Sequence, residues 1–250
     1  MHLITFGTDE HMLNASSKQH ERLLSYVPLV DSLTAIIFTK KTDWAVRDIG
    51  NLKLIQVPKK GLLFNLYKTY KYLKQSKRTS GDTVISAQDP FEVGFITWIF
   101  SVLLGYPLHL QIHSAVQSDR ARTESLRSRI QYMLFVGLRS RARAIRVVSK
   151  PIKDFLISKG LAAEDIFVSP VVAEPATTFK TEKYTGGTIR LLSVGRFVPV
   201  KNLMNLIEAF SVISKKYDTH LTIVGGGPLQ NDLVIKVKEL GLGDKVSVSG

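Results

Sequence analysis

Cysteine is absent from the 250 residues of the sequence. Its absence excludes disulfide bonds and metal sites built from thiolates, including structural zinc sites. A long apolar run is also missing, because the longest one, residues 93–106, is shorter than the roughly 20 residues that a membrane-spanning helix needs. The N-terminus does not show the basic, apolar and small-residue order of a signal peptide. These absences favour a cytoplasmic protein without a transmembrane span.

Acidic residues are scarce relative to basic ones: 21 Asp and Glu stand against 34 Lys and Arg, for a net charge of +13. The excess is concentrated from Arg120 to Arg146, where only Glu124 opposes it. The other arginines of this segment are Arg122, Arg127, Arg129, Arg139, Arg141 and Arg143. The ordinary interpretation of this segment is a core-facing helix with solvated basic ends. The sharper hypothesis is a patch that contacts an anionic membrane surface, while no basic motif interleaved with aromatic residues supports nucleic acid.

The first 170 residues alternate short apolar runs with segments of helical periodicity. Strands are expected at residues 3–6, 33–38, 52–57, 83–87, 108–113 and 145–148. Helices are expected at 18–26, 62–74, 91–104 and 125–138, followed by a short helix that Ser149 caps and Gly160 ends. This alternation predicts an α/β fold with a parallel sheet, in which ligands bind beyond the carboxyl ends of the strands.

Residues 171–188 are rich in Pro, Thr and Gly and have no periodicity, which predicts a linker between domains. A second α/β series follows it. Its expected strands are 189–194, 221–224 and 245–248, and its expected helices are 203–216 and 229–240. Three strands and two helices make half of a doubly wound domain. We therefore expect two domains, residues 1–170 and 189–250, of which the second is incomplete.

The stretch LLSVGRFVPVKNLMNLIEAF, residues 191–210, combines features of an anion site. Its apolar run 191–194 predicts a buried strand, and Gly195, Arg196 and Lys201 follow before a helix begins. A glycine at the end of a strand lets the backbone approach a ligand, and the next helix offers unpaired N–H groups. With two cations added, a diphosphate would find a complete set of donors. A solvated pair of surface cations is the equally weighted alternative.

The second strand-to-helix turn, IVGGGPLQ, contains Gly225, Gly226 and Gly227. A dinucleotide-binding G-x-G-x-x-G motif would need glycine where Gln230 stands, so a nicotinamide enzyme is disfavoured. The three glycines indicate either a second approach to a phosphate ligand or a tight turn without one.

Asp89 follows the strand expected at 83–87 and is placed to N-cap the next helix, with Pro90 at its first position and Glu92 completing a capping box. It could also position an acceptor hydroxyl or act as a base. His109 and His113 would lie roughly 13 Å apart on a strand and could not share a metal ion. We expect no metal.

Taken together, residues 191–210 and the stretch LTIVGGGPLQNDLVIKVKELGLGDKVSVSG resemble the donor-binding half of family 4 (group 1) glycosyltransferases, which have the GT-B fold. The N-terminal part resembles the same family in ISAQDPFEVGFITWIFSVLLGYPLHLQIH and IRVVSKPIKDFLISKGLAAEDIFVSP. The resemblance covers almost the whole chain and implies two Rossmann-like domains, with the nucleotide-sugar donor held by the C-terminal one and the acceptor by the N-terminal one.

The resemblance also implies roles for individual residues. Arg196 and Lys201 would contact the donor diphosphate, His113 would hydrogen-bond the transferred sugar, and Gly7 would let the first loop approach the donor. Gly195 and the three glycines 225–227 would line the donor site, and Asp89 would lie on the acceptor side. No metal or other cofactor is expected, since the two cations would stabilise the leaving group.

The expected function is therefore transfer of a hexose from a nucleotide-sugar to a glycan or lipid-linked acceptor, with retention of configuration, by a cytoplasmic enzyme that is peripheral to the membrane. The family's pair of glutamates would lie beyond Gly250, so we expect this chain alone to be weakly active or inactive. The alternatives are an inverting GT-B transferase, a sugar-nucleotide epimerase, and a non-catalytic module that binds sugar-nucleotides or anionic lipid.

Overall fold

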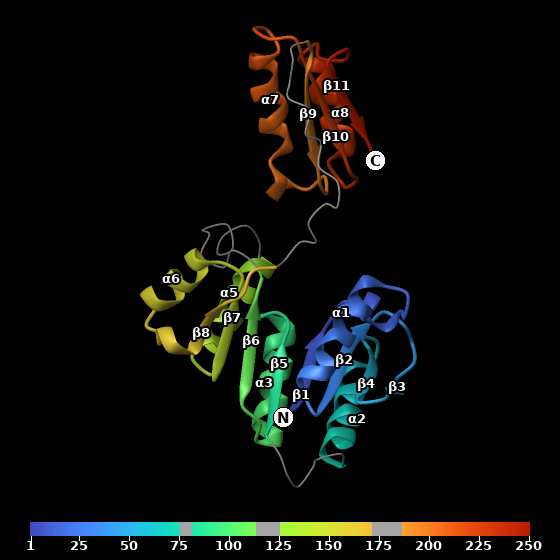
Figure 1. Cartoon of the computed structure of the whole chain (residues 1–250), viewed down its shortest axis with the longest axis vertical. Helices are drawn as coiled ribbons and strands as arrows, with labels where there is room; N and C mark the ends of the chain where they lie inside the picture. Colours follow the sequence, from blue (N-terminus) through green and yellow to red (C-terminus); the bar gives the residue numbers. More distant parts are fainter. Residues whose placement is uncertain (76–81, 114–125, 172–186) are drawn as a thin grey trace. The chain divides into compact units, whose positions relative to one another are not determined.

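The structure, a computed structural model, describes residues 1–75, 82–113, 126–171 and 187–250. The chain forms two compact units, Met1–Glu174 and Pro175–Gly250 (Figure 1). Most of the expected linker, residues 172–186, lies outside the described residues.

The first unit is built on an eight-stranded sheet in the order β3-β4-β2-β1-β5-β6-β7-β8. Every neighbouring pair is parallel except β3 with β4. The strands are β1 (His2–Gly7), β2 (Ser32–Thr39), β3 (Ala45–Ile49), β4 (Leu52–Pro58), β5 (Thr83–Ala87), β6 (Leu108–Ile112), β7 (Ala144–Val147) and β8 (Ile166–Val168).

Five described helices of this unit cover the sheet unequally. They are α1 (Lys18–Tyr26), α2 (Leu62–Gln75), α3 (Glu92–Leu104), α5 (Leu126–Arg139) and α6 (Lys150–Ser158). The short 3-10 helices are η1 (Glu10–Leu13), η2 (Val27–Leu29) and η3 (Ala163–Asp165). Right-handed crossovers explain this distribution. The chain moves from β1 towards β2 through α1, and after β4 it moves in the opposite direction, towards β5 and then β8, through the later helices. Crossovers of the same hand that run in opposite directions lie on opposite faces of the sheet.

The helices α2, α3, α5 and α6 pack on one face of the sheet, here called the helical face, against residues such as Phe6, Leu110 and Val147. On the opposite face, here called the open face, α1 and η1 cover β1, β2 and β4 through Leu23 and Met12. The open face is therefore apolar over one half of the sheet. Over β5, β6 and β7, which no described crossover helix covers, it is polar.

The expected strands and helices of this unit are all present, with ends shifted by one or two residues. Two strands were not expected, β3 and β8. The antiparallel strand β3 lies at the edge of the sheet and is largely exposed, so its residues lack the apolar pattern of a buried strand. β8 has only three residues, too few for a periodic pattern to show.

The second unit has a three-stranded parallel sheet in the order β11-β10-β9. Its elements are β9 (Ile189–Val194), η4 (Pro199–Lys201), α7 (Leu203–Ile213), β10 (Thr219–Val224), α8 (Gln230–Glu239) and β11 (Val246–Ser249). The helices pack on the sheet through a core that includes Phe197, Ile207, Phe210, Ile223 and Leu233.

The prediction of a buried strand at 191–194 is wrong. β9 is an edge strand, and the side chains of Leu192 and Val194 are 68% and 72% exposed. In the described part of the unit, apolar packing is built around α7 and α8, and neither Leu192 nor Val194 takes part in it. Helix α7 is also shorter than expected and ends at Ile213.

Across the described residues, no helix is both long and apolar enough to cross a membrane.

Candidate functional site

The carboxyl end of β1 lies beside that of β5, where the connections of the sheet change direction. This is the position at which open α/β sheets bind ligands. Gly7 ends β1, and a Cβ atom built on it would lie 2.2 Å from Oε1 of Gln88. The backbone N–H of Gln88 donates to the carbonyl of Phe6 at 3.0 Å. Gly7 therefore makes room for the side chain of Gln88, a neighbour that the sequence did not indicate.

A cavity of about 730 Å³ opens on the polar half of the open face. Its lining includes His113 and Gln88 but, within the described part of the unit, neither Gly7 nor Asp89. The other side chains that line it with polar or charged groups are Thr5, Gln19, Arg22, Tyr26, Ser86, His109, Gln111, Arg146 and Ser169. This set contains cations and neutral groups and no carboxylate, so the cavity favours neutral or anionic ligands.

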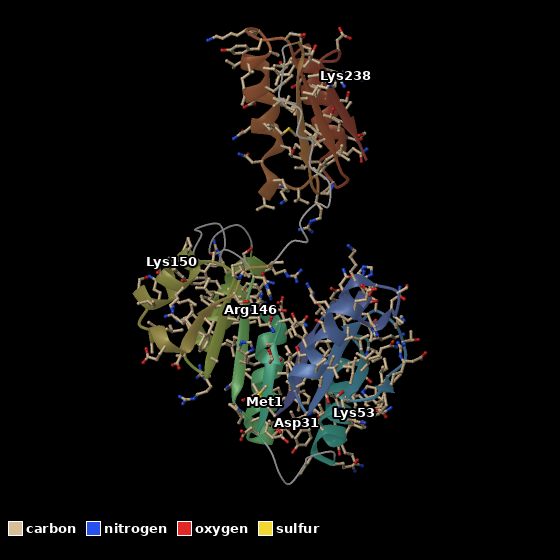
Figure 2. The ribbon with its side chains drawn as sticks, viewed as in Figure 1. Met1, Asp31, Lys53, Arg146, Lys150 and Lys238 are labelled. Carbon is tan, nitrogen blue, oxygen red and sulfur yellow. The ribbon has the colours of Figure 1, made fainter. Side chains whose placement is uncertain are left out.

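Four of these residues form a chain of hydrogen bonds across β7, β6 and β5. Arg146 Nη1 donates to Gln111 Oε1 at 3.2 Å, Gln111 Nε2 donates to Ser86 Oγ at 3.2 Å, and Ser86 Oγ lies 2.9 Å from His109 Nδ1. Arg146 Nη2 also donates to the carbonyl of Ser169 at 2.9 Å. In the view of Figure 2, Arg146 lies above Met1 and Asp31.

The two histidines of β6 and its end have lowered pKa values. Burial, with the nearby charge of Arg146, lowers the pKa of His109 to about 4. For His113, partial burial and then the charges of Arg146 and Arg22 lower the pKa. His109 is therefore neutral at pH 7, and its Nδ1 shares a hydrogen bond with the Ser86 hydroxyl. The spacing of His109, Gln111 and His113 along one strand was the sequence signal for a polar face.

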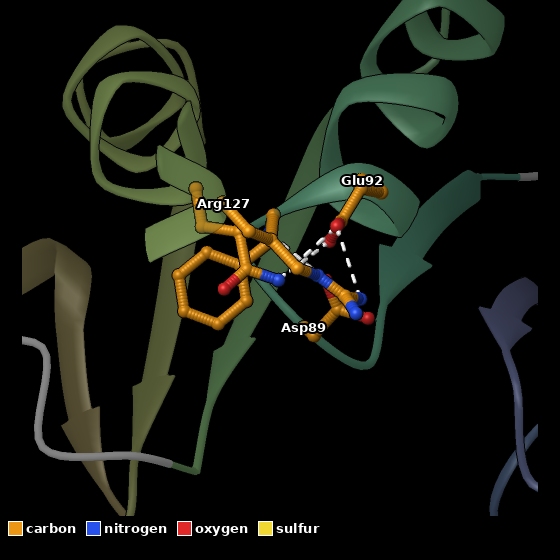
Figure 3. A network of polar contacts seen from close by, with 5 residues as sticks. Asp89, Glu92 and Arg127 are labelled. Carbon is orange, nitrogen blue, oxygen red and sulfur yellow. Dashed lines mark hydrogen bonds and ion pairs between the residues drawn. The ribbon is translucent and has the colours of Figure 1, made fainter. Parts of the chain in front are cut away.

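Asp89 does not occupy the expected N-cap position. Helix α3 begins at Glu92, so Phe91 is its N-cap residue, and it makes no side-chain cap bond. Asp89 Oδ1 instead accepts the N–H of Phe91 at 2.9 Å and holds the turn before the helix (Figure 3). Burial, followed by the charge of Glu92, raises the pKa of Asp89. The similar prediction for Ser149 is also incomplete, because Ser149 precedes α6 without a side-chain cap bond.

The expected role of Glu92 in a capping box is also wrong. The carboxylate of Glu92 turns to α5, where it accepts from Gln131 Nε2 at 3.1 Å and from Arg127 Nη2 at 3.4 Å (Figure 3). Glu92 therefore ties α3 to α5. Arg127, one of the residues of the basic segment, has a structural partner.

In the second unit, Gly195 and Arg196 follow β9, and Lys201 ends η4. The Lys201 side chain folds back towards the end of β9, since its Cε lies 3.7 Å from a Cβ atom built on Gly195. Arg196 and Lys201 are exposed, and within the described residues neither forms an ion pair. Asn202 has a left-handed φ of 54° and is the N-cap residue of α7. The two cations thus lie on one loop at the carboxyl edge of the sheet.

The glycines of the second loop differ from one another in what surrounds them. A Cβ atom on Gly225 would lie 2.0 Å from the carbonyl oxygen of Gly195, and one on Gly227 would lie 2.6 Å from that of Phe197. Both have positive φ, 148° and 154°. Gly226 has no atom within 4 Å of a built Cβ. Gly225 and Gly227 thus allow close packing against the first loop, while Gly226 borders open space.

Backbone hydrogen bonds lock these two loops together. Gly195 donates to Val224 at 3.0 Å, Phe197 donates to Gly226 at 2.8 Å, and Leu229 donates to Phe197 at 3.2 Å. The side chain of Phe197 is fully buried beneath them. The result is a rigid double loop that presents two cations and a glycine to solvent, an arrangement suited to a phosphate-bearing ligand.

Residues 176–250 match the family model described as glycosyl transferases group 1. The second unit is therefore similar to the group 1 glycosyl transferases. This match supports the expected family for the unit that carries the double loop. No curated protein matches the chain.

Solved structures show that the whole chain has the GT-B fold of glycosyltransferases. The lipopolysaccharide outer core galactosyltransferase WaaB in its apo form has a TM-score of 0.66 and 16% identity, with 99% of this chain and 67% of that chain covered. Anabaena Alr3699/HepE in complex with UDP and glucose gives 0.63 and 15%, with 99% and 68% covered. The UDP-forming α,α-trehalose-phosphate synthase from Burkholderia vietnamiensis gives 0.66 and 10%, with 100% and 73% covered.

Among the described residues, no group of three or more His, Asp and Glu could hold a metal ion. The expectation that the protein works without a metal stays a prediction.

Proposed function

We propose that the protein transfers a hexosyl group from a nucleotide-sugar to a glycan or lipid-linked acceptor, with retention of anomeric configuration. The observation that carries this proposal is the double loop of the second unit, where Arg196 and Lys201 share the carboxyl edge of the sheet with Gly226. The family match of residues 176–250 supports it. UDP and UDP-glucose occupy structures of the similar Anabaena protein, which supports a nucleotide-sugar donor.

In the proposed reaction, Arg196 and Lys201 hold the donor diphosphate and neutralise the negative charge that grows on it as the glycosidic bond breaks. Each such preorganised donor is typically worth about 3 to 4 kcal/mol in the transition state. The guanidinium can engage two phosphate oxygens at once, and the ammonium acts as a mobile point charge. With these cations in place, the leaving group is stabilised without a metal ion.

On the side of the first unit, His113 is proposed to hydrogen-bond the transferred sugar, and Asp89 to lie near the acceptor. The lowered pKa of His113 favours the neutral imidazole, which can accept as well as donate a hydrogen bond. The raised pKa of Asp89 suits a group that exchanges a proton with a hydroxyl. The cavity that His113 lines contains hydroxyl and amide groups of the kind that bind sugars.

A titration of the full chain with UDP, followed by calorimetry, tests the proposal. Replacement of both cations, Arg196→Ala with Lys201→Ala, is expected to weaken UDP binding at least tenfold, because charge-assisted hydrogen bonds are lost. The matched control is Lys238→Ala, an exposed lysine of α8 in the same unit (Figure 2), which should leave the affinity unchanged. If the unchanged protein, the double variant and the control bind UDP with equal affinity, Arg196 and Lys201 do not form a diphosphate site and the proposed function is refuted.

The cytoplasmic location remains a prediction from the sequence. The contact with an anionic membrane surface through the arginine segment, residues 120–146, also remains a prediction. Of its arginines, Arg120 and Arg122 lie outside the described residues.

A further inference from the structure

The floor of the cavity on the open face is a polar patch that crosses four strands of the sheet. Thr5, Ser86 and His109 stand in register on the neighbouring strands β1, β5 and β6, and all three line the cavity. Gln111 and Arg146 are paired in register on β6 and β7. Because side chains alternate along a strand, these five project from one face of the sheet.

The same cavity reaches the carboxyl edge of the sheet. Gln88, His113 and Ser169 follow the ends of β5, β6 and β8, and all three line it. Helix α1, on the open face, contributes Arg22 and Tyr26 from the side. Open α/β sheets bind their ligands at this edge. The cavity is therefore placed where a substrate would be held, and residues of the first unit form its described lining.

Two arginines give the cavity a positive charge that no carboxylate of its described lining balances. The half-buried Arg146 donates to neutral acceptors, Gln111 Oε1 and the carbonyl of Ser169. Arg22 is exposed, and within the described residues neither arginine forms an ion pair. After burial, the charges of Arg146 and Arg22 are what lowers the pKa of His113. Both guanidinium charges therefore act on the same space.

A ligand that fills the cavity takes water away from these guanidinium groups. A charge that loses its water costs free energy unless an opposite charge pairs with it. A neutral ligand would leave Arg146 with only Gln111 and Ser169 as partners, whereas a phosphate or a carboxylate would balance its charge. A guanidinium carries several N–H donors, so Arg146 retains donors for such a group beside the two bonds that it already makes. The lining therefore favours an anionic ligand over a neutral one.

The size and the remaining lining of the cavity indicate that the anionic group is part of a larger molecule. Its volume of about 730 Å³ is that of an ordinary small-molecule site and exceeds what a free phosphate needs. Leu3, Met12 and Leu23 supply apolar lining, while Gln19 and Tyr26 supply an amide and a hydroxyl. A sugar ring offers matching surfaces, with hydroxyl groups around its rim and C–H groups on its faces.

We propose that this cavity binds the acceptor, and that the acceptor is a sugar with an anionic group, a phosphate ester or a carboxylate, held by Arg22 and Arg146. That the ligand is the acceptor rests on the proposed function, whereas the preference for an anionic sugar rests on the lining of the cavity alone. The two arginines select the charge of the acceptor, and the hydroxyl and amide groups bind its ring. Gln111 and Ser169 orient Arg146 for this role.

Binding of three monosaccharides to the full chain, measured by saturation-transfer NMR titration, tests the proposal. Glucose, glucose 6-phosphate and glucuronate have the same ring and differ in charge. At least one of the charged sugars should bind about tenfold more tightly than glucose, because it gains charge-assisted hydrogen bonds. Tighter binding of glucose 6-phosphate would indicate a phosphate-bearing acceptor, and tighter binding of glucuronate a carboxylate-bearing one.

Two substitutions connect the preference to the cavity. Arg22→Ala and Arg146→Gln should each reduce the preference for the charged sugar over glucose about tenfold. Glutamine at position 146 keeps an amide donor for Gln111 and Ser169, and tryptophan fluorescence in denaturant checks that each variant still folds. The matched control is Arg129→Ala, which removes an exposed arginine of α5 that does not line the cavity. It should leave all three affinities unchanged.

Equal binding of the three sugars, no binding of any of them, or a preference that survives in Arg22→Ala and Arg146→Gln would refute the proposal. A loss of the same size in Arg129→Ala would also overturn it, because net charge alone would then explain the preference. UDP affinity should be unchanged in the variants of the first unit. Affinity for the charged sugar should be unchanged when Arg196→Ala and Lys201→Ala are combined, so the anionic acceptor site and the diphosphate site can fail independently.

Discussion

The double loop of the second unit predicts that two adjacent glycines differ greatly in their tolerance of alanine. Gly225→Ala places a methyl group 2.0 Å from the carbonyl oxygen of Gly195, at a φ of 148°. A side chain at such a φ costs about 1–3 kcal/mol, and the collision adds about 1–3 kcal/mol because backbone cannot turn aside. Gly226→Ala meets nothing within 4 Å. We expect Gly225→Ala to destabilise the second unit by about 3 kcal/mol and Gly226→Ala by less than about 0.5 kcal/mol.

Hydrogen exchange of the β10 peptide, residues 219–224, measures the stability of the second unit within the full chain. A loss of about 3 kcal/mol corresponds to roughly a hundredfold faster exchange of its protected amides. Both tryptophans, Trp44 and Trp98, lie in the first unit, so denaturant unfolding followed by tryptophan fluorescence reports that unit and should not change. Equal exchange rates for the two alanine variants would show that the loops do not pack as described.

Two further predictions concern the first unit. The folded-state pKa of His109, about 4, lies below its unfolded value of 6.5, so the folded state loses at most about 3 kcal/mol of stability as the pH falls from about 6.5 to 4. In His109→Gln this loss should be smaller, as measured by denaturant unfolding followed by tryptophan fluorescence at each pH. An unchanged pH profile would contradict the lowered pKa of His109. Gly94→Ala places a methyl group 2.8 Å from the carbonyl oxygen of Asp89 and should lower the free energy of unfolding by about 1–3 kcal/mol. Arg127→Ala removes an exposed ion pair at 3.4 Å and should cost less than about 1 kcal/mol. Similar losses in these two variants would argue against the close approach of Gly94 to the turn at Asp89.

The fold was predictable from the sequence where burial imposes a pattern on the residues. β1, β2 and β4 are covered on both faces by packed side chains and appear as apolar runs, and helices such as α1 begin at a capping residue, Ser17. β3 escaped prediction because its exposed residues carry no pattern. For β9 the strand was predicted correctly but its burial was not. Its apolar run indicated a buried strand, whereas β9 lies at the edge of the sheet and is largely exposed.

The candidate site was predictable only in part, for a related reason. Gly195, Arg196 and Lys201 are close in the sequence, so one loop brings them together. The partners of Gly7 and His113 come from other strands: Gln88 follows β5, and Arg146 belongs to β7. Their proximity depends on strand order and register, which local patterns do not encode. For Asp89 the error lies in the exact start of the helix. Because α3 begins two residues later than expected, Asp89 stabilises the turn before the helix and is not its N-cap residue.

The backbone bonds among Gly195, Phe197, Gly226 and Leu229 have a consequence for how a ligand would be received. Because main-chain contacts already fix both turns, an incoming pyrophosphate would have to order little more than the side chains of Arg196 and Lys201. A flexible loop loses conformational entropy when its ligand binds, whereas these two loops lost most of theirs when the chain folded. This preorganisation favours tight binding from few contacts.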